Sequence, residues 1–268
     1  MPSRVVDTLP SYERVLFRPV HLELALAQVK FPPLARFDEE GYLTDFKDAM
    51  SGEYPLPAVE HALGLMVTSQ GVSQAKGPMV YRFSTLDYGW SATLTADAIS
   101  LESRNAYTDI NQFAARLSGI LEKVRDTLRP RHQLRFGLRY VNEFRHEQRG
   151  ETYEGWAALG LNPDLLGMGT RNVLGGTVQQ TVSEIRTDRP DGSLVIRHGF
   201  LDGTTVPPAA GRKQKTGRFY LLDLDYFNEQ PGDFDSRPLD RMIVYNDFLY
   251  RVFRWCVGNG DLYRDLQA

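Results

Sequence analysis

Cysteine is almost absent from this sequence, which has Cys256 as its single residue of that type in 268. One cysteine excludes an intramolecular disulfide and any metal site built from several thiolates. Apolar runs are also short, and none reaches the roughly 18 residues that a membrane-spanning helix needs. The stretch Met1 to Asp7 lacks the apolar core of a signal peptide. From these absences we expect a cytoplasmic protein with no membrane contact.

Charge of one sign is not in excess either, since 31 Lys and Arg stand against 34 Asp and Glu, for a net charge of −3. This balance excludes the overall basic character of a general nucleic-acid binder, although a local basic patch remains open. Nucleophile-elbow, phosphate-loop and dinucleotide-binding glycine motifs are lacking. No two of the five histidines have metal-ligand spacing. We therefore expect no cofactor and no metal, and favour a protein that is not an enzyme.

The most regular pattern present is the alternation from Leu134 to Arg145. Its even positions are mostly apolar, and its odd positions include Arg135, Arg139, Glu143 and Arg145. A period of two over twelve residues predicts one long strand with a buried face and a charged face.

Two halves of the chain show a similar order of predicted elements. Before residue 131 we predict a strand at 19–31, a helical interlude at 38–50 and an ambiguous stretch at 58–78. Three short antiparallel strands follow at 79–83, 90–94 and 98–102, and then a helix from about 108 to 129. After residue 131 come the 134–145 strand, an interlude at 150–172, strands at 177–185, 194–200 and 219–227, and a helix from about 236 to 258. In both halves the order is strand, interlude, three strands and long helix.

This order predicts an α+β fold in which each long helix packs on a curved antiparallel sheet. We expect residues 1–268 to form one globular domain made of two pseudo-repeated halves, at about 15–130 and 131–268. A groove between the halves would be the default place for a ligand or partner.

Four segments of the chain resemble a sporadically distributed bacterial family of unknown function. Gly137 to Asn142 reads Gly-Leu-Arg-Tyr-Val-Asn and is similar to that family's Gly-Leu-Arg-Tyr-Ile-Asn signature. The other similar segments are Val29 to Pro33, Tyr220 to Phe227 and Val252 to Val257. The resemblance implies no activity, catalytic residue or cofactor. Sporadic occurrence would suit an accessory role, for example in defence or toxin neutralisation.

Arginines on the charged face of the 134–145 strand are the first candidates for a site. Arg135, Arg139 and Arg145 could form a platform for an anion or phosphate, because guanidinium groups bind such groups bidentately. The alternative is a cross-strand charge ladder with partners such as Asp223, Asp225 or Glu184. Asn142, at the end of the family signature, is included as a binding candidate.

The second candidates are Asp223 and Asp225, which share one strand face because they are two residues apart. They could bind Mg²⁺ or Mn²⁺ in a hydrolase or nuclease, although a third ligand is not evident. They could equally lie at a solvent-facing strand end or pair with arginines. His198, at the end of a predicted strand, is the best candidate for a general base, and a structural histidine is the alternative.

The last candidate is a basic loop at 204–217, followed by Arg218, which could contact an acidic partner or nucleic acid. Taken together, these features favour a non-enzymatic binding or regulatory module for a protein partner or small ligand. The alternatives are the metal-dependent hydrolase and nucleic-acid binding through the loop and the Arg139 face. The oligomeric state does not follow from the sequence.

Overall fold

The computed structural model describes residues 8–15, 17, 21–68, 71–104, 106–167, 169, 175–203, 215–235 and 237–267, with side chains from 61 to 78 left out. Its contacts divide the chain into two compact units. Unit 1 comprises residues 1–25, 138–228 and 240–268, and unit 2 comprises residues 26–137 and 229–239. Both unit boundaries in the first 140 residues fall inside strands, so β1 (Leu22–Lys30) and β7 (Arg135–Phe144) each contribute residues to both units.

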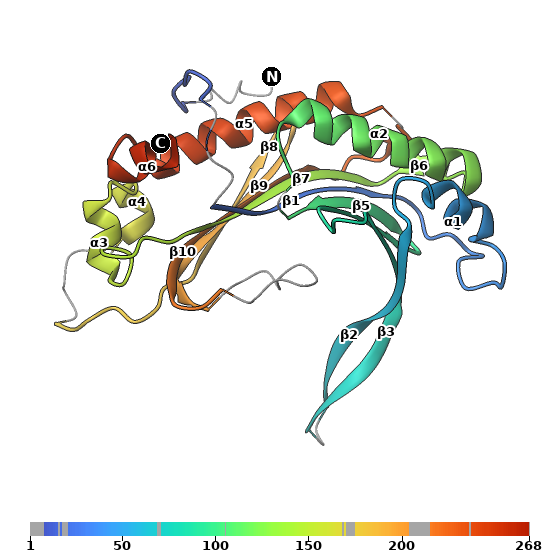
Figure 1. Ribbon diagram of the computed structural model, residues 1–268, viewed down its shortest axis with the longest axis horizontal. Helices are drawn as coiled ribbons and strands as arrows, with labels where there is room; N and C mark the ends of the chain where they lie inside the picture. Colours follow the sequence, from blue (N-terminus) through green and yellow to red (C-terminus); the bar gives the residue numbers. More distant parts are fainter. Residues whose placement is uncertain are drawn as a thin grey trace. The chain divides into compact units, whose positions relative to one another are not determined.

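Unit 2 holds a short helix, a meander of four strands and a long helix (Figure 1). In chain order these are α1 (Thr44–Met50), β2 (Leu56–Thr68), β3 (Gly71–Ser84), β4 (Trp90–Thr95), β5 (Ala98–Ser103) and α2 (Ile110–Thr127). A two-stranded ribbon of β6 (His132–Gln133) and β11 (Gly232–Asp233) completes the unit. Asp109 caps α2, because its side chain accepts hydrogen bonds from the amides of Asn111 and Gln112.

Unit 1 holds three further strands and four helices among its described residues. They are α3 (Tyr153–Ala158), α4 (Pro163–Leu166), β8 (Ser183–Arg189), β9 (Gly192–Asp202), β10 (Arg218–Asn228), α5 (Leu239–Val257) and α6 (Asp261–Gln267). Gly258 ends α5 with a φ of +61°, which a residue without Cβ adopts at little cost.

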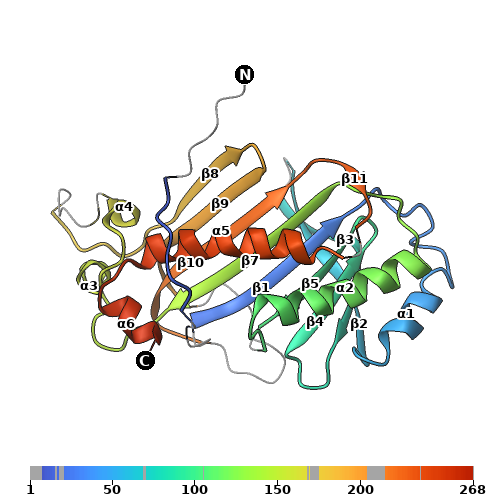
Figure 2. The same cartoon turned by 90° about the horizontal axis from the view of Figure 1, so that it is seen from above.

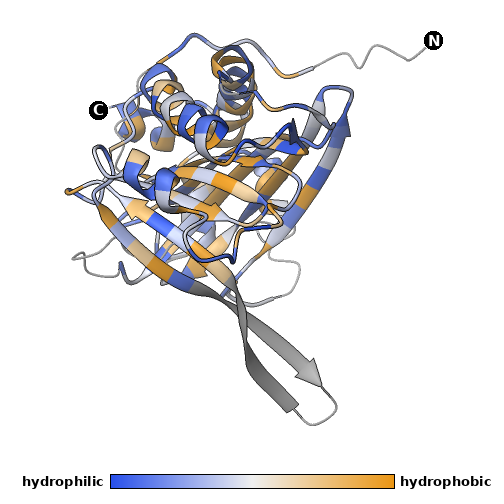
Figure 3. Cartoon of the chain, turned by 90° about the vertical axis from the view of Figure 1, so that its right-hand side faces the viewer, coloured by the Kyte–Doolittle hydropathy of each residue, from blue (hydrophilic) through white to orange (hydrophobic). Residues whose placement is uncertain are grey.

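The described strands, apart from β6 and β11, form a nine-stranded sheet in the order β2-β3-β4-β5-β1-β7-β10-β9-β8. The hairpins β2–β3, β3–β4, β4–β5, β8–β9 and β9–β10 are antiparallel. Polar and apolar residues alternate along the strands (Figure 3). An α+β class with a large antiparallel sheet is therefore confirmed.

Within each unit the long helix packs on one face of the strands. In unit 2, α2 contributes Phe113, whose ring centroid lies 5.6 Å from that of Trp90 on β4. In unit 1, α5 lies across its strands (Figure 2), and its Tyr245 packs 4.7 Å from Tyr226 on β10. Phe253, nearer the end of α5, contacts Phe144 of β7 at 6.1 Å. The other face of each set of strands carries the charged residues.

An N-terminal segment, residues 8–15, is attached to α5 through main-chain hydrogen bonds and through the side chains of Tyr12 and Arg14. Tyr250 donates to the carbonyl of Glu13 at 2.8 Å and accepts from the amide of Val15 at 2.9 Å. Arg251 donates to the carbonyls of Leu9 and Pro10. This N-terminal segment forms one wall of a pocket of about 440 Å³ whose other walls come from β9 and α5.

Several predictions of elements were correct in type and shifted in position. The 134–145 strand is β7, and the two long helices are α2 and α5, each shorter at its start than expected. The strand predicted at 177–185 is β8, which begins at Ser183. Within the stretch that the sequence left ambiguous, residues 58–68 belong to β2 and residues 71–78 to β3, so the first half has four strands after its interlude instead of three. The helix α6 was not predicted.

Candidate functional site

Four charged side chains form a row across the helix-free face of unit 1. The row runs over neighbouring strands in the order Glu184 on β8, Arg197 on β9, Asp223 on β10 and Arg139 on β7. Glu184 lies opposite Arg197, and Arg197 lies opposite Asp223, in the strand register. Because side chains alternate between the two faces of a strand, these residues project away from α5. We call these four residues the charge row.

The central carboxylate of the charge row is shared by two guanidinium groups. Arg139 binds Asp223 through two parallel hydrogen bonds, from Nε to Oδ1 at 2.8 Å and from Nη2 to Oδ2 at 2.7 Å. Arg197 reaches the same Oδ2 from Nη1 at 3.5 Å and donates from Nε to Glu184 at 2.6 Å. Two-pronged contacts of this kind fix the orientation of a guanidinium as well as its position.

The acids and bases of the charge row differ in exposure. The Asp223 side chain is 3% exposed, whereas those of Arg139 and Arg197 are each 36% exposed. The hydrogen bonds and charge of Asp223 raise the pKa of Arg139 above its ordinary value, and the nearby charge of Asp225 adds to the effect. The face therefore presents fixed cations over a buried anion, with the carboxylate of Glu184 at the exposed end.

A second ion pair joins Glu143 of β7 to Arg145, which follows the strand. Arg145 donates to the buried carboxylate of Glu143 at 2.9 Å. It also donates to the carbonyls of Gly203, Thr216 and Gly217 and stacks over the ring of Phe219 at 4.7 Å. Arg145 thus makes structural contacts within the protein, as the charge-ladder alternative expects of the arginines on this face.

Most of the predicted basic loop, 204–214, lies outside the described residues, including Arg212 and Lys213. The two basic residues that follow are in contact with the fold. Lys215 pairs with Glu23, and Arg218 binds the carbonyl and side chain of Gln179. These two cations therefore have partners within the protein.

Among the predicted site residues, Arg139, Asp223 and Asp225 come together on one face. Arg135 projects from the same face of β7, but its guanidinium lies across Gly137 and binds Gln28 at 3.2 Å. A Cβ at position 137 would come within 2.7 Å of Arg135 Nη1, which gives the glycine of the signature a packing role.

Asn142 does not belong with these residues. It is even-numbered on β7 and so projects from the opposite face to Arg139. It is 3% exposed, and its amide donates to the carbonyl of Leu222 at 3.1 Å. The inclusion of Asn142 in the site was wrong, because its hydrogen bond satisfies a buried carbonyl between β7 and β10.

His198 is also misplaced as a general base. It lies within β9, opposite Leu222, and not at a strand end. The ring is 5% exposed, stacks on Tyr220 and contacts the Tyr220 hydroxyl at 2.9 Å through Nδ1. Burial lowers the pKa of His198 below its usual value of 6.5, so the neutral ring is favoured. The structural alternative describes this histidine correctly.

Asp223, one of the two predicted ligands for Mg²⁺ or Mn²⁺, is already occupied by an arginine. Both oxygens of Asp223 accept hydrogen bonds from Arg139, and a cation would have to displace that guanidinium. The solvent-facing alternative was wrong for Asp223 as well, since the residue is buried. Over the residues that the structure describes, no three His, Cys, Asp or Glu side chains are grouped so as to hold a metal ion. For Asp223, the alternative of pairing with arginines is confirmed.

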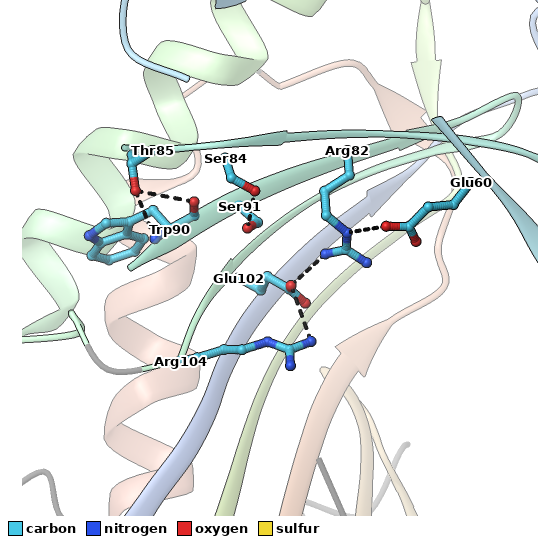
Figure 4. Close-up of polar contacts among 8 residues, drawn as sticks. All are labelled: Glu60, Arg82, Ser84, Thr85, Trp90, Ser91, Glu102 and Arg104. Carbon is cyan, nitrogen blue, oxygen red and sulfur yellow. Dashed lines mark hydrogen bonds and ion pairs between the residues drawn. The ribbon is translucent and has the colours of Figure 1, made fainter. Parts of the chain in front are cut away.

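Sequence reasoning missed a second polar row, on the face of unit 2 opposite α2 (Figure 4). Arg82 on β3 donates to Glu60 of β2 at 3.2 Å and to Glu102 of β5 at 2.6 Å, and Arg104 binds Glu102 at 3.4 Å. A period-two alternation in the sequence could have predicted this row. Arg82 stands between Tyr81 and Phe83, and Glu102 stands between Leu101 and Ser103. Arg197 was not among the predicted site residues, because its partners Glu184 and Asp223 lie on two other strands.

The chain was compared with known proteins, and it matches no protein-family model and no curated protein sequence. In the part of the chain that the structure describes, every helix falls short of the length and apolar character needed to cross a membrane.

Proposed function

We propose that this protein is a non-enzymatic binding module that uses the charge row to recognise a protein partner carrying charges of both signs. The observation behind the proposal is that Arg139 and Arg197 share the buried carboxylate of Asp223 while a third of each side chain stays exposed. Partner carboxylates would face the two arginines, and a partner cation would face Glu184.

Fixed guanidinium groups favour recognition because little side-chain entropy remains to be lost on binding. Arg139 commits Nε and Nη2 to Asp223, and Arg197 commits Nε and Nη1 to its two acids. A guanidinium has five N–H donors in a planar arrangement, so each arginine still has outward hydrogens for a second carboxylate.

A mixed-charge protein surface fits the row better than a nucleic-acid backbone does. Glu184 is 57% exposed beside Arg197 and would repel a continuous run of phosphates. Neighbouring strands are about 4.8 Å apart, so the charges alternate on the scale of side chains in a protein interface. Nucleic-acid binding is therefore the second candidate, and its strong salt dependence distinguishes it.

We also infer that the two halves of the chain are related by duplication and that the protein acts in the cytoplasm. Both units carry the same order of charges on the helix-free face. Unit 1 has Glu184–Arg197–Asp223–Arg139, and unit 2 has Glu60–Arg82–Glu102–Arg104. In each unit the first acid–arginine pair joins two strands of one hairpin. The single buried thiol of Cys256 is compatible with a reducing compartment.

The experiment is quantitative affinity capture from the native host with the full chain and a matched pair of variants. The double variant Arg139→Lys with Arg197→Lys keeps the net charge but loses the planar guanidinium groups. Arg36→Lys is the control, because Arg36 makes an exposed ion pair with Glu39. We expect a protein captured by wild type and Arg36→Lys to be lost from the double variant.

Capture is carried out with and without nuclease, and thermal unfolding verifies that each variant is folded. Equal capture by all three proteins would refute a role for the charge row. Loss of the captured material on nuclease treatment would favour the nucleic-acid alternative instead.

A further inference from the structure

A pocket of about 440 Å³ lies within unit 1, between the N-terminal segment, β9 and α5. Residues 8–10 form one wall, Leu194 and Ile196 of β9 form the second, and Val252 and Trp255 of α5 form the third. The N-terminal segment runs over α5 beside these walls (Figure 2). Ligand pockets in proteins commonly measure about 300–1,000 Å³, so this one has room for a small molecule.

The walls of the pocket are held in place by the rest of unit 1. The two side chains from β9 are each 8% exposed and Val252 is 2% exposed, so these walls are packed into the core. The N-terminal wall is held through its main chain, because Arg251 donates to the carbonyls of Leu9 and Pro10. Pro10 also restricts its own backbone, since its ring fixes φ. Fixed walls lose little conformational entropy when a ligand binds between them.

The lining of the pocket is almost entirely apolar. The Thr8 hydroxyl and the Trp255 indole N–H are the polar groups among its side chains, and no lining side chain is charged. Water in such a space finds few hydrogen-bond partners, so an apolar molecule displaces it at little cost. An extended peptide would bring main-chain N–H and C=O groups into the pocket, where the lining offers them few partners. A small apolar molecule therefore suits the pocket better than a peptide does.

Trp255 gives the pocket an aromatic surface. The other two tryptophans pack against rings of the fold, Trp90 on Phe113 at 5.6 Å and Trp156 on Tyr220 at 5.8 Å. Over the residues that the structure describes, the Trp255 ring stacks on no other aromatic ring. Pairs of aromatic rings in offset or edge contact gain more than the burial of their area alone. An aromatic ligand would supply the ring that Trp255 does not find within unit 1.

We propose that this pocket binds a small, neutral aromatic molecule, whose ring packs between Trp255 and the aliphatic side chains of β9. A charged group inside the pocket would have no counter-ion, because no lining side chain is charged. A single hydroxyl or carbonyl group on the molecule would face Thr8. The pocket lies on the opposite face of the strands from the charge row, since Leu194 and Ile196 alternate with Arg197 along β9. The proposal does not depend on the binding function of the charge row.

The test is a titration of N-phenyl-1-naphthylamine, a neutral aromatic probe that fluoresces more strongly in apolar surroundings, with the full chain up to about 100 µM. Wild type should bind the probe saturably at one site per chain, with a dissociation constant in the micromolar range. Pro10→Trp and Ile196→Phe add bulk to two different walls, so we expect each to raise that constant about tenfold or more. The analogue 1-anilinonaphthalene-8-sulfonate has the same rings and a negative charge, and it should bind about tenfold more weakly or worse.

Val244→Trp is the matched control, because Val244 lies on α5, is 58% exposed and is outside the pocket lining, so this variant should bind the probe like wild type. Thermal unfolding verifies that each variant is folded. Pro10 is exposed, so Pro10→Trp tests the pocket even if Ile196→Phe does not fold. A wild type without saturable binding overturns the proposal, as does a folded Pro10→Trp that binds the probe like wild type. Equal weakening in Val244→Trp, or a sulfonate that binds as tightly as the neutral probe, overturns it as well.

Discussion

Replacing Asp223 with asparagine should destabilise unit 1 far more than the change of one atom suggests. The side chain is 3% exposed and accepts three hydrogen bonds from Arg139 and Arg197, at 2.7, 2.8 and 3.5 Å. Asparagine keeps one oxygen but turns an NH₂ group toward guanidinium donors, and it removes the negative charge between two cations.

The expected size of the effect follows from the exposure of the partners. Removing one member of a fully buried ion pair costs about 3–5 kcal/mol. Here water reaches a third of Arg139 and Arg197, which reduces the penalty for leaving them without a full carboxylate partner. We therefore expect Asp223→Asn to lower the free energy of unfolding by about 2–3 kcal/mol.

The measurement is urea unfolding followed by tryptophan fluorescence, in a Trp90→Phe background so that Trp156 and Trp255 report on unit 1. Arg139→Met and the double variant complete a cycle with Asp223→Asn, and the coupling energy should be about 1–3 kcal/mol. Glu184→Gln is the control, because a 57% exposed partner should contribute about 1 kcal/mol or less. Additive single effects, or an Asp223→Asn cost no larger than that of Glu184→Gln, would refute the reasoning.

Three further predictions concern buried groups. Because burial lowers the folded-state pKa of His198 below 6.5, the unfolded chain binds more protons in acid, so stability should fall as pH drops below about 6.5, by up to about 1.4 kcal/mol per pH unit for this group. His198→Gln should reduce the change of the urea unfolding midpoint between pH 7 and 5. The same pH dependence in His198→Gln as in wild type would contradict a lowered pKa of His198. Cys256 is fully buried and the pKa of its thiol is raised by desolvation, so a thiol reagent should label the protein only once it is denatured. Rapid labelling of the folded protein would show that Cys256 is accessible. Gly260→Ala would place a Cβ 2.6 Å from the carbonyl oxygen of Leu159, so it should lower the free energy of unfolding by about 2 kcal/mol or more. A Cβ at Gly52 meets nothing within 4 Å, so Gly52→Ala should lower it by about 0.5 kcal/mol or less. Equal effects in thermal or urea unfolding would rule out the close contact at Gly260.

The parts of the fold that could be predicted have long, uninterrupted periodicity. β7 alternates for its whole length, and α2 and α5 keep an apolar stripe over several turns, so local spacing was sufficient. The β2–β3 hairpin is interrupted in sequence by Gly64, Gly71 and the Gly77–Pro78 pair, which are poor strand formers. Pairing with the opposite strand stabilises Gly64 and Gly71 in extended form, and Gly77 and Pro78 lie where the β2–β3 register shifts. Neither contribution is visible from local sequence.

The sequence predicted which residues of a single strand belong to the candidate site, but not which residues of different strands contact one another. Parity on β7 and β10 placed Arg139 and Asp223 on charged faces, and their ion pair was among the predicted alternatives. The two residues are 84 positions apart, and their contact depends on β7 and β10 being neighbours in the sheet. Asn142, three residues from Arg139, projects from the opposite face because side chains alternate along β7, and the adjacency of β10 explains its hydrogen bond to Leu222.

The attachment of the N-terminal segment has a consequence for how this molecule tolerates change. Tyr250 and Arg251 grip carbonyl and amide groups, which every amino acid supplies apart from the missing N–H of proline. Point mutations between Leu9 and Val15 should consequently spare these main-chain contacts. Changes at Tyr12 or Arg14 would remove side-chain contacts with α5, because the Tyr12 ring lies 4.9 Å from the Arg254 guanidinium and Arg14 pairs with Asp247 at 3.2 Å. Over evolutionary time we expect residue identity to drift along this stretch while its two anchoring side chains on α5 are retained.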